Sequence, residues 1–288
     1  MARPTSPTVS RRELANTLRS LRLRSRKTLE EAAAALEVSA ATVSRIETGV
    51  RVPRARDVKD LCAFYGVTDP NRVAELAALV ADARESGWWE GYSEVDEAYS
   101  TFIGLEAAAT SIDQFENSHV PTFLQTTDYG TAMQRDGVSP GRRRPFTDHD
   151  ITKRIEVLTR RQQLLTNQAL RYTVILDEAA LLRTVGGPAV MREQIANLVK
   201  ATERSETEIL VLPLDRGAHP GQPGGFTILS LPQVQVSDVV YLDSLAGQLF
   251  IEAEGELERY RSIFSTLRSM ALNAGKSIEV MNNRLTAY

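Results

Sequence analysis

One stretch of the sequence carries residues suited to contact with a large, negatively charged partner. The stretch SAATVSRIETG, residues 39–49, opens with a serine that can cap a helix N-terminus and closes with a glycine suited to a helix C-terminus. Val43 and Ile46 lie three residues apart, so they share one face of this short helix and are expected to be buried. The opposite face is small and polar with a single long cation, and it comprises Ala40, Ala41, Ser44 and Arg45.

A second group of polar residues, later in the chain, could supply acid–base or binding chemistry. The group comprises Glu106, Arg160, Arg161, Gln162, Glu178 and His219. A carboxylate beside an arginine and a loop histidine can act as acid–base machinery. A helix N-terminus explains Glu178 equally well, and His219 lies in GAHPGQPGG, a loop expected to be mobile. No phosphate loop or nucleophile elbow occurs, so we expect no enzyme; Arg160, Gln162, Glu178 and His219 are instead candidates for binding an effector or a partner protein.

Composition favours a two-domain protein without metal or cofactor. The 288 residues exceed most single domains. The single cysteine, Cys62, excludes an internal disulfide and sits in an apolar pattern typical of a core. The three histidines are too scattered for a zinc site. No apolar run approaches the ~18 residues of a membrane span, and the N-terminus lacks the apolar core of a signal peptide, so we expect a cytoplasmic protein without membrane contact.

Charge is distributed unevenly along the chain. Residues 1–65 contain 13 Lys+Arg and 7 Asp+Glu, whereas the whole chain has a net charge of −3. A basic module on an acidic body suits a nucleic-acid-binding protein, because attraction to phosphate supplies most of the non-specific affinity. Solvated arginine-rich helices are the alternative interpretation of the same charges.

The first third of the chain predicts five helices after a disordered tail at 1–9. The expected helices cover about 11–25 and 28–36, the stretch between the cap Ser39 and Gly49, a segment after Pro53, and 71–85. Thr28 and Glu31 form a capping-box pattern at the second helix, and Glu37 and Val38 make a tight turn to the third. Two short helices joined by so tight a turn predict a helix-turn-helix, whose second helix enters a major groove. We therefore expect an all-α DNA-binding domain over 10–85.

The segment TLEEAAAALEVSAATVSRIETGVRVP resembles the helix-turn-helix of the phage-repressor (Xre-like) family. The resemblance implies that the outer-face residues Ala40, Ala41, Ser44 and Arg45 face the bases. It places Ser39, Thr42 and Thr48 near phosphates. We also expect Thr28, the cap of the second helix, among the DNA-binding residues. We expect Arg51, Arg54 and Arg56, which follow the recognition helix, to contact phosphates as well, unless they form only a solvated face.

The same resemblance implies a salt bridge between Arg22 and Glu47 that holds the recognition helix on the scaffold. Two positions depart from the family pattern. Leu29 stands where the family often has glutamine, and Glu37 stands where it usually has glycine. A left-handed glutamate at that turn is expected to be strained by roughly 1 kcal/mol.

The remaining residues, 86–288, predict an α+β domain with a mainly antiparallel sheet. Trp88 and Trp89 mark its start and are expected to pack one domain against the next. Expected helices cover about 102–117, 126–134, 148–165, 178–184, 188–202, 254–272 and 277–285, and expected strands cover 171–176, 207–212, 226–231, 238–242 and 248–253. The later strands are joined by short loops, which favours antiparallel pairing.

This region is similar to the large C-terminal domain of unknown function in many actinobacterial helix-turn-helix regulators. The similarity covers about 85–275 and rests on LEAAATSIDQFENSHVPTFLQTTDYGTAM, TRRQQLL, VILDEAALLRTVGG, VLPLDRGAHPGQPGGFTIL and VVYLDS. Thr122 and Asp243 depart from the family's usual glycine and glutamate. Some members of that group are described as antitoxin-like regulators encoded beside a small partner protein.

Together these features predict a sequence-specific transcription regulator that binds double-stranded DNA. One module buries little DNA, so we expect a homodimer on an inverted-repeat operator with half-sites about 34 Å apart. The C-terminal domain would dimerise and sense a small molecule or a partner protein. The alternative is an antitoxin-type protein that neutralises a small partner and binds DNA for autoregulation.

Overall fold

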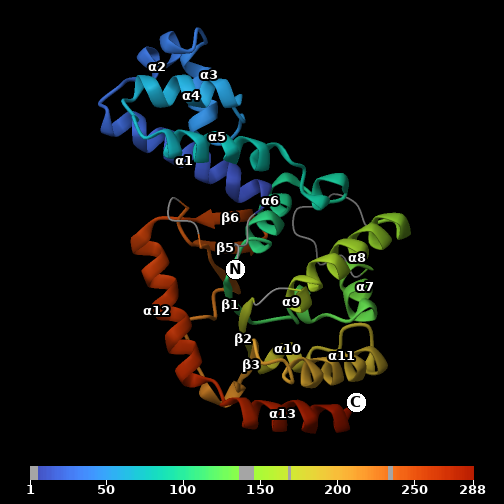
Figure 1. The fold of residues 1–288 in the computed structure, drawn as a ribbon. Helices are drawn as coiled ribbons and strands as arrows, with labels where there is room; N and C mark the ends of the chain where they lie inside the picture. The colour runs from blue at the N-terminus through green and yellow to red at the C-terminus, as the bar shows by residue number, and fades with distance from the viewer. Residues whose placement is uncertain (1–5, 136–145, 168–169, 233–235) are drawn as a thin grey trace. The chain divides into compact units, whose positions relative to one another are not determined.

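The computed structural model describes residues 6–135, 146–167, 170–232 and 236–288, and Figure 1 shows its fold. The chain divides into two compact units. Unit 1 comprises Met1–Gly91 with Leu231–Ser237, and unit 2 comprises Tyr92–Ser230 with Asp238–Tyr288. The chain therefore passes from unit 1 to unit 2 just after Trp88 and Trp89, and a short later segment belongs to unit 1.

Unit 1 contains the five predicted α-helices and one short 3₁₀ helix. Their bounds are α1 Pro7–Arg24, α2 Leu29–Ala35, α3 Ala40–Glu47, α4 Ala55–Phe64, α5 Pro70–Arg84 and η1 Trp88–Gly91. The disordered tail expected over 1–9 is wrong for residues 6–9, and residues 1–5 lie outside the described part. Ser6 caps α1 by accepting a hydrogen bond from the Val9 N–H, and Pro7 stands in the first turn, where a missing N–H costs nothing.

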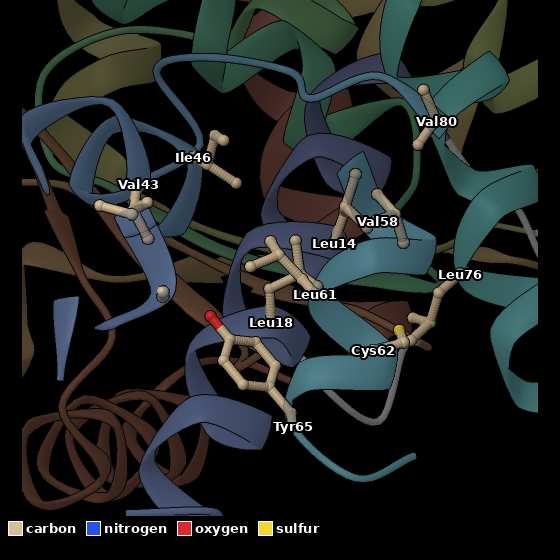
Figure 2. Close-up of a cluster of buried hydrophobic side chains, with 12 residues drawn as sticks. Leu14, Leu18, Val43, Ile46, Val58, Leu61, Cys62, Tyr65, Leu76 and Val80 are labelled. Atoms are coloured by element: carbon tan, nitrogen blue, oxygen red, sulfur yellow. The ribbon is translucent and has the colours of Figure 1, made fainter. Parts of the chain in front are cut away.

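The helices of unit 1 enclose one apolar core. Figure 2 shows the buried side chains meeting from α1, α3, α4 and α5: Leu14, Leu18, Val43, Ile46, Val58, Leu61, Cys62, Tyr65, Leu76 and Val80. Ala32 and Ala33 of α2 are also buried, and their small side chains let the neighbouring helices approach closely. Cys62 lies in this core as predicted, and burial raises the pKa of its thiol.

Unit 2 is an α+β unit built on a six-stranded mixed sheet, which confirms the predicted fold class. The strands are β1 Ser111–Glu116, β2 Arg171–Asp177, β3 Thr207–Leu212, β4 Phe226–Ser230, β5 Val239–Ser244 and β6 Gly247–Ile251, in the order β3-β2-β1-β4-β5-β6. The pairs β1–β2 and β2–β3 are parallel, whereas β1–β4, β4–β5 and β5–β6 are antiparallel. Three of the five strand pairs are thus antiparallel, and the two parallel pairs lie together at the β3 edge of the sheet.

The helix expected over 102–117 is wrong in its second half. The helix α6 spans Glu97–Glu106, and the following residues form β1, a central strand. The alanines at 107–109 favour a continuing helix locally. Pairing on both edges overrides that preference, because β1 bonds to β2 on one side and to β4 on the other.

Helices cover both faces of the sheet (Figure 1). The remaining helices of unit 2 are η2 Thr122–Leu124, α7 Thr127–Arg135, α8 Asp148–Gln162, α9 Leu164–Asn167, α10 Glu178–Leu182, α11 Pro188–Ala201, η3 Leu214–Arg216, α12 Glu254–Met270 and α13 Ala274–Ala287. On one face, Phe264 and Leu267 of α12 pack in a core that includes Phe115 of β1. On the opposite face, Phe102 of α6 stacks on Tyr241 with ring centroids 4.0 Å apart. In the described residues no helix is both long and apolar enough to span a bilayer.

Candidate nucleic-acid interface

The helix α3 is fixed at its N-terminus by its own side chains. The Ser39 hydroxyl accepts a hydrogen bond from the Thr42 N–H at 3.2 Å, and the Ser39 and Thr42 hydroxyls lie 3.0 Å apart. Val43 and Ile46 are buried in the core, as the three-residue spacing predicts. The predicted inward face of α3 is therefore confirmed.

A buried ion pair joins α3 to α1. The Arg22 Nε and Nη2 atoms donate to the two Glu47 carboxylate oxygens at 2.7 and 2.8 Å, and Arg22 Nη1 donates to the Lys27 carbonyl at 2.9 Å. The Arg22 and Glu47 side chains are only 11% and 5% exposed. The hydrogen bond to Glu47 raises the pKa of Arg22. This geometry confirms the predicted pair and fixes the orientation of α3 on α1.

The turn between α2 and α3 contains a residue in the left-handed conformation. Glu37 has φ 55°, and its N–H donates to the Ala34 carbonyl, while the Val38 N–H donates to the Ala33 carbonyl at 3.0 Å. These two bonds close the C-terminus of α2. A glycine at position 37 would adopt the same left-handed conformation without strain. The predicted left-handed glutamate is therefore confirmed.

The outer face of α3 presents Arg45 and Ala41. Both are exposed, and Arg45 makes no side-chain hydrogen bond or ion pair within the described part of the chain. Ser44 is half-buried, and Ala40 is half-buried because it packs against the core. Of the two alanines expected at the bases, Ala41 is thus the one presented to solvent.

Some of the residues expected at phosphates already use their polar groups in hydrogen bonds within the protein, and others are exposed to solvent. The Thr48 hydroxyl donates to the Ser44 and Arg45 carbonyls at 3.0 and 3.3 Å, so it already closes the end of α3. Thr28 caps α2 in a complete capping box with Glu31. The three predicted phosphate-binding arginines are all exposed: Arg51, Arg54 and Arg56. Arg56 Nε lies 3.5 Å from an Asp60 carboxylate oxygen in an exposed pair on α4. Contact of the three arginines with phosphate stays a prediction.

The four candidates for an effector or partner lie in two separate places in unit 2. On α8, Gln162 donates to the Thr122 and Gln125 carbonyls at 3.0 and 2.6 Å, and Arg160 lies 3.5 Å from the Tyr92 hydroxyl. After β2, Glu178 accepts hydrogen bonds from Arg284 and from the Leu214 N–H. His219 lies near that second place, with its Nε2 3.3 Å from an Asp177 carboxylate oxygen. The structure does not bring the four together as one site.

The glycine-rich loop around His219 is held against β1 rather than free. The His219 side chain is 8% exposed and meets the Phe115 ring edge-on, with centroids 5.7 Å apart. A Cβ at Gly221 would lie 2.3 Å from Phe115 Cε1, so only glycine fits there. The loop was expected to be mobile, but His219 and Gly221 both pack against the ring of Phe115 and anchor it there.

The Glu106 and Arg161 side chains form a second buried pair. Arg161 Nε and Nη2 donate to the two Glu106 oxygens, each at 2.7 Å, and Arg161 also bonds to the Tyr99 hydroxyl. The guanidinium lies 5.2 to 5.5 Å from the ring centroids of Tyr99, Phe102 and Phe123. Burial raises the pKa of Glu106. This geometry suits a structural role, because both oxygens are already bonded.

Sequence reasoning missed a polar cluster at the carboxyl end of β1. Glu116, His119 and Asp243 lie there, and the Glu116 Oε2 is 3.6 Å from His119 Nε2. The alternation of Gln114 and Glu116 along β1 could have revealed the cluster, because alternate residues of a strand share one face. The misassigned helix over 102–117 hid that signal.

Comparisons with known proteins agree with this architecture. A family described as Helix-turn-helix domain matches residues 13–76. A family described as Domain of unknown function (DUF5753) matches residues 99–283, which is more than half of the chain. No curated protein and no solved structure matches the chain. The Xre-like subgroup and an actinobacterial origin stay predictions. The chain belongs to the family of the Domain of unknown function (DUF5753), here preceded by a helix-turn-helix domain.

Proposed function

We propose that the protein is a sequence-specific, DNA-binding transcription regulator that reads its operator with α3. The helix-turn-helix domain indicates a DNA-binding regulator. The observation that carries the finer proposal is the exposed Arg45 side chain on a helix locked by the Arg22–Glu47 pair. A helix held on a rigid scaffold fixes the point from which the Arg45 side chain extends toward the bases.

The outer face of α3 suits recognition of bases in a major groove. Arg45 can donate two parallel hydrogen bonds to O6 and N7 of guanine, and the Ala41 methyl can contact a thymine methyl. Arg51, Arg54 and Arg56 lie exposed after α3 and would contact phosphates, which fixes the register of the helix on the duplex. Base recognition would therefore rest on few residues, and specificity from one module would be modest.

A homodimer on an inverted repeat would supply the remaining affinity. Two modules double the number of base and phosphate contacts, and their separation sets the spacing of half-sites at about 34 Å. Unit 2 would dimerise the chain and would bind the signal, which is a small-molecule effector or a partner protein. The protein would act in the cytoplasm, where the DNA is accessible. The antitoxin alternative shares the DNA-binding step and differs in what unit 2 binds, so a pull-down from native extract analysed for protein and small-molecule content separates them.

The test begins with selection of binding sites from a random duplex library by the full-length protein. Titration of the selected duplex should then show that Arg45→Ala loses about 1 to 3 kcal/mol of binding free energy, with little change on a random duplex. Arg72→Ala is the matched control, because Arg72 lies on α5 and pairs with Glu75. Equal losses on both duplexes would show that Arg45 contacts phosphate alone. Failure to enrich any sequence would contradict sequence-specific binding.

A further inference from the structure

The turn between α1 and α2 carries an arginine in a backbone conformation that favours glycine. Arg26 has φ 54°, and its N–H donates to the Leu23 carbonyl at 3.1 Å. The Lys27 N–H donates to the Arg22 carbonyl at 3.1 Å, which completes the end of α1. The helix α4 ends with the same two backbone bonds, and there the left-handed residue is Gly66, at φ 80°. Local structure alone therefore favours glycine at position 26, because a side chain strains this conformation.

The chain around this turn is strongly basic. From the middle of α1 to the first residue of α2 the sequence has five basic residues and no acidic one. Arg22 and Lys27 have acidic partners, and Arg19 and Arg24 lie within α1, where an exposed arginine is an ordinary helix residue. Neither explanation applies to Arg26, whose exposed side chain makes no hydrogen bond or ion pair in the described part of the chain.

One guanidinium ties this turn to the C-terminal end of α3. Arg22 donates to the Lys27 carbonyl at 2.9 Å and to the Glu47 carboxylate at 2.7 and 2.8 Å. The Lys27 side chain extends toward α4, where its Nζ lies 4.9 Å from the centroid of the Phe64 ring. Arg26 is thus the exposed cation of a turn that is bonded to the recognition helix through a single side chain.

The dimensions of a duplex place phosphates close to such a segment. A major groove is about 12 Å wide, and a helix with its side chains is about 10 to 12 Å across, so a phosphate strand runs along each side of a helix in the groove. A segment bonded to one end of α3 therefore lies close to one of these strands when α3 lies in the groove. The local excess of positive charge favours that contact, because phosphate attraction is electrostatic.

We propose that Arg26 contacts a backbone phosphate of the duplex that α3 reads. Its guanidinium would donate to the phosphate oxygens and would add a second chain segment to the contacts expected from the arginines after α3. The contact would explain why an arginine stands where glycine is free of strain. This inference rests on the proposed function, because it takes α3 as the helix in the groove.

Strain alone does not carry the inference, because Glu37 has the same left-handed conformation at the end of α2. Glu37 and Arg26 are both exposed, and they differ in the sign of their charge. Replacing each by glycine therefore makes one backbone change twice, and only Arg26→Gly removes a cation. Glu37→Gly is the matched control.

The salt dependence of DNA binding tests the contact. The full-length protein is titrated with the selected duplex and with a random duplex of equal length between about 50 and 200 mM KCl. Arg26→Gly should bind both duplexes about threefold to tenfold more weakly, and the slope of log K against log salt concentration should become shallower by about one. Arg26→Lys should keep most of that slope, because it keeps the cation. Glu37→Gly should bind both duplexes at least as tightly as the wild type.

Urea unfolding of the same variants excludes a loss of fold, because glycine at either position should leave unit 1 at least as stable as in the wild type. An unchanged affinity and salt slope in Arg26→Gly would overturn the proposal. A loss on the selected duplex alone would also overturn it, since that result indicates a base contact, and so would an equal loss in Glu37→Gly.

Failure of the proposed function would look different from failure of this contact. In that case no sequence is enriched, or Arg45→Ala weakens both duplexes equally. The titration of Arg26→Gly with the random duplex still decides whether Arg26 contacts phosphate, because that contact does not depend on sequence.

Discussion

Removing Glu47 should unfold unit 1 more easily, because it leaves the Arg22 guanidinium buried with one partner. In Glu47→Ala the two short hydrogen bonds to the carboxylate disappear, and the Lys27 carbonyl remains as the acceptor for Nη1. Breaking a buried pair from one side costs about 3 to 5 kcal/mol. Arg22 is 11% exposed, so water can reach part of it, and we expect about 3 kcal/mol.

Urea unfolding followed by tryptophan fluorescence measures this loss in the full-length protein. The sequence has two tryptophans, Trp88 and Trp89, and both lie in unit 1, so the signal reports that unit. The double variant Arg22→Met/Glu47→Leu should recover most of the stability, because it removes both charges and keeps apolar volume. A loss below about 1 kcal/mol in Glu47→Ala would refute the reasoning that the pair is buried and unreplaced by water.

Three further changes test strain, packing and burial. Glu37→Gly should stabilise unit 1 by about 0.5 to 1 kcal/mol in the same urea assay, because glycine relieves the left-handed strain at some cost in unfolded-state entropy; a destabilised variant would show that no strain is stored there. Gly221→Ala should destabilise unit 2 by about 1 to 3 kcal/mol in thermal unfolding, because its methyl would overlap Phe115, whereas Gly255→Ala, in open space, should be harmless. Burial raises the pKa of Glu116, so the folded wild type loses stability as the pH rises past the unfolded-state pKa, and the loss is complete above the raised folded-state pKa. Glu116→Gln should therefore stabilise unit 2 at pH 8, and the gain should shrink as the pH falls to 4; a gain that is equal at both pH values would contradict the raised pKa.

Local signals were sufficient to predict most of unit 1 from the sequence, although the start of α1 was missed. Ser39 and the Thr28 capping box fix helix starts within one turn, and the spacing of Val43 and Ile46 fixes which face is buried. The ion pair between Arg22 and Glu47 could be predicted from the family resemblance alone, since nothing local links residues so far apart. Helix caps and spacing act over a few residues, which is why they can be read without a structure.

In unit 2 the pairing between distant strands could not be predicted from the sequence. The residues of β1 follow an alanine run that favours helix, and their strand form depends on partners at Arg171 and Ser230. The polar cluster of Glu116, His119 and Asp243 could be predicted only in part. The alternation along β1 marks Glu116, whereas His119 and Asp243 are brought beside it by the sheet and the segments around it. Sequence spacing reveals sites within one element, whereas this site draws on several.

The position of β1 at the centre of the sheet has a consequence for synthesis of the chain. Ser111 of β1 pairs with Arg171 on one side and with Ser230 on the other, so both neighbours are translated long after it. The helices of unit 1, by contrast, all lie within the first 91 residues and can fold while the rest of the chain is still on the ribosome. A nascent or truncated chain that ends before β4 would carry β1 with one open edge, a known template for aggregation. Unit 2 is therefore the part of the protein whose folding depends on the chain being finished.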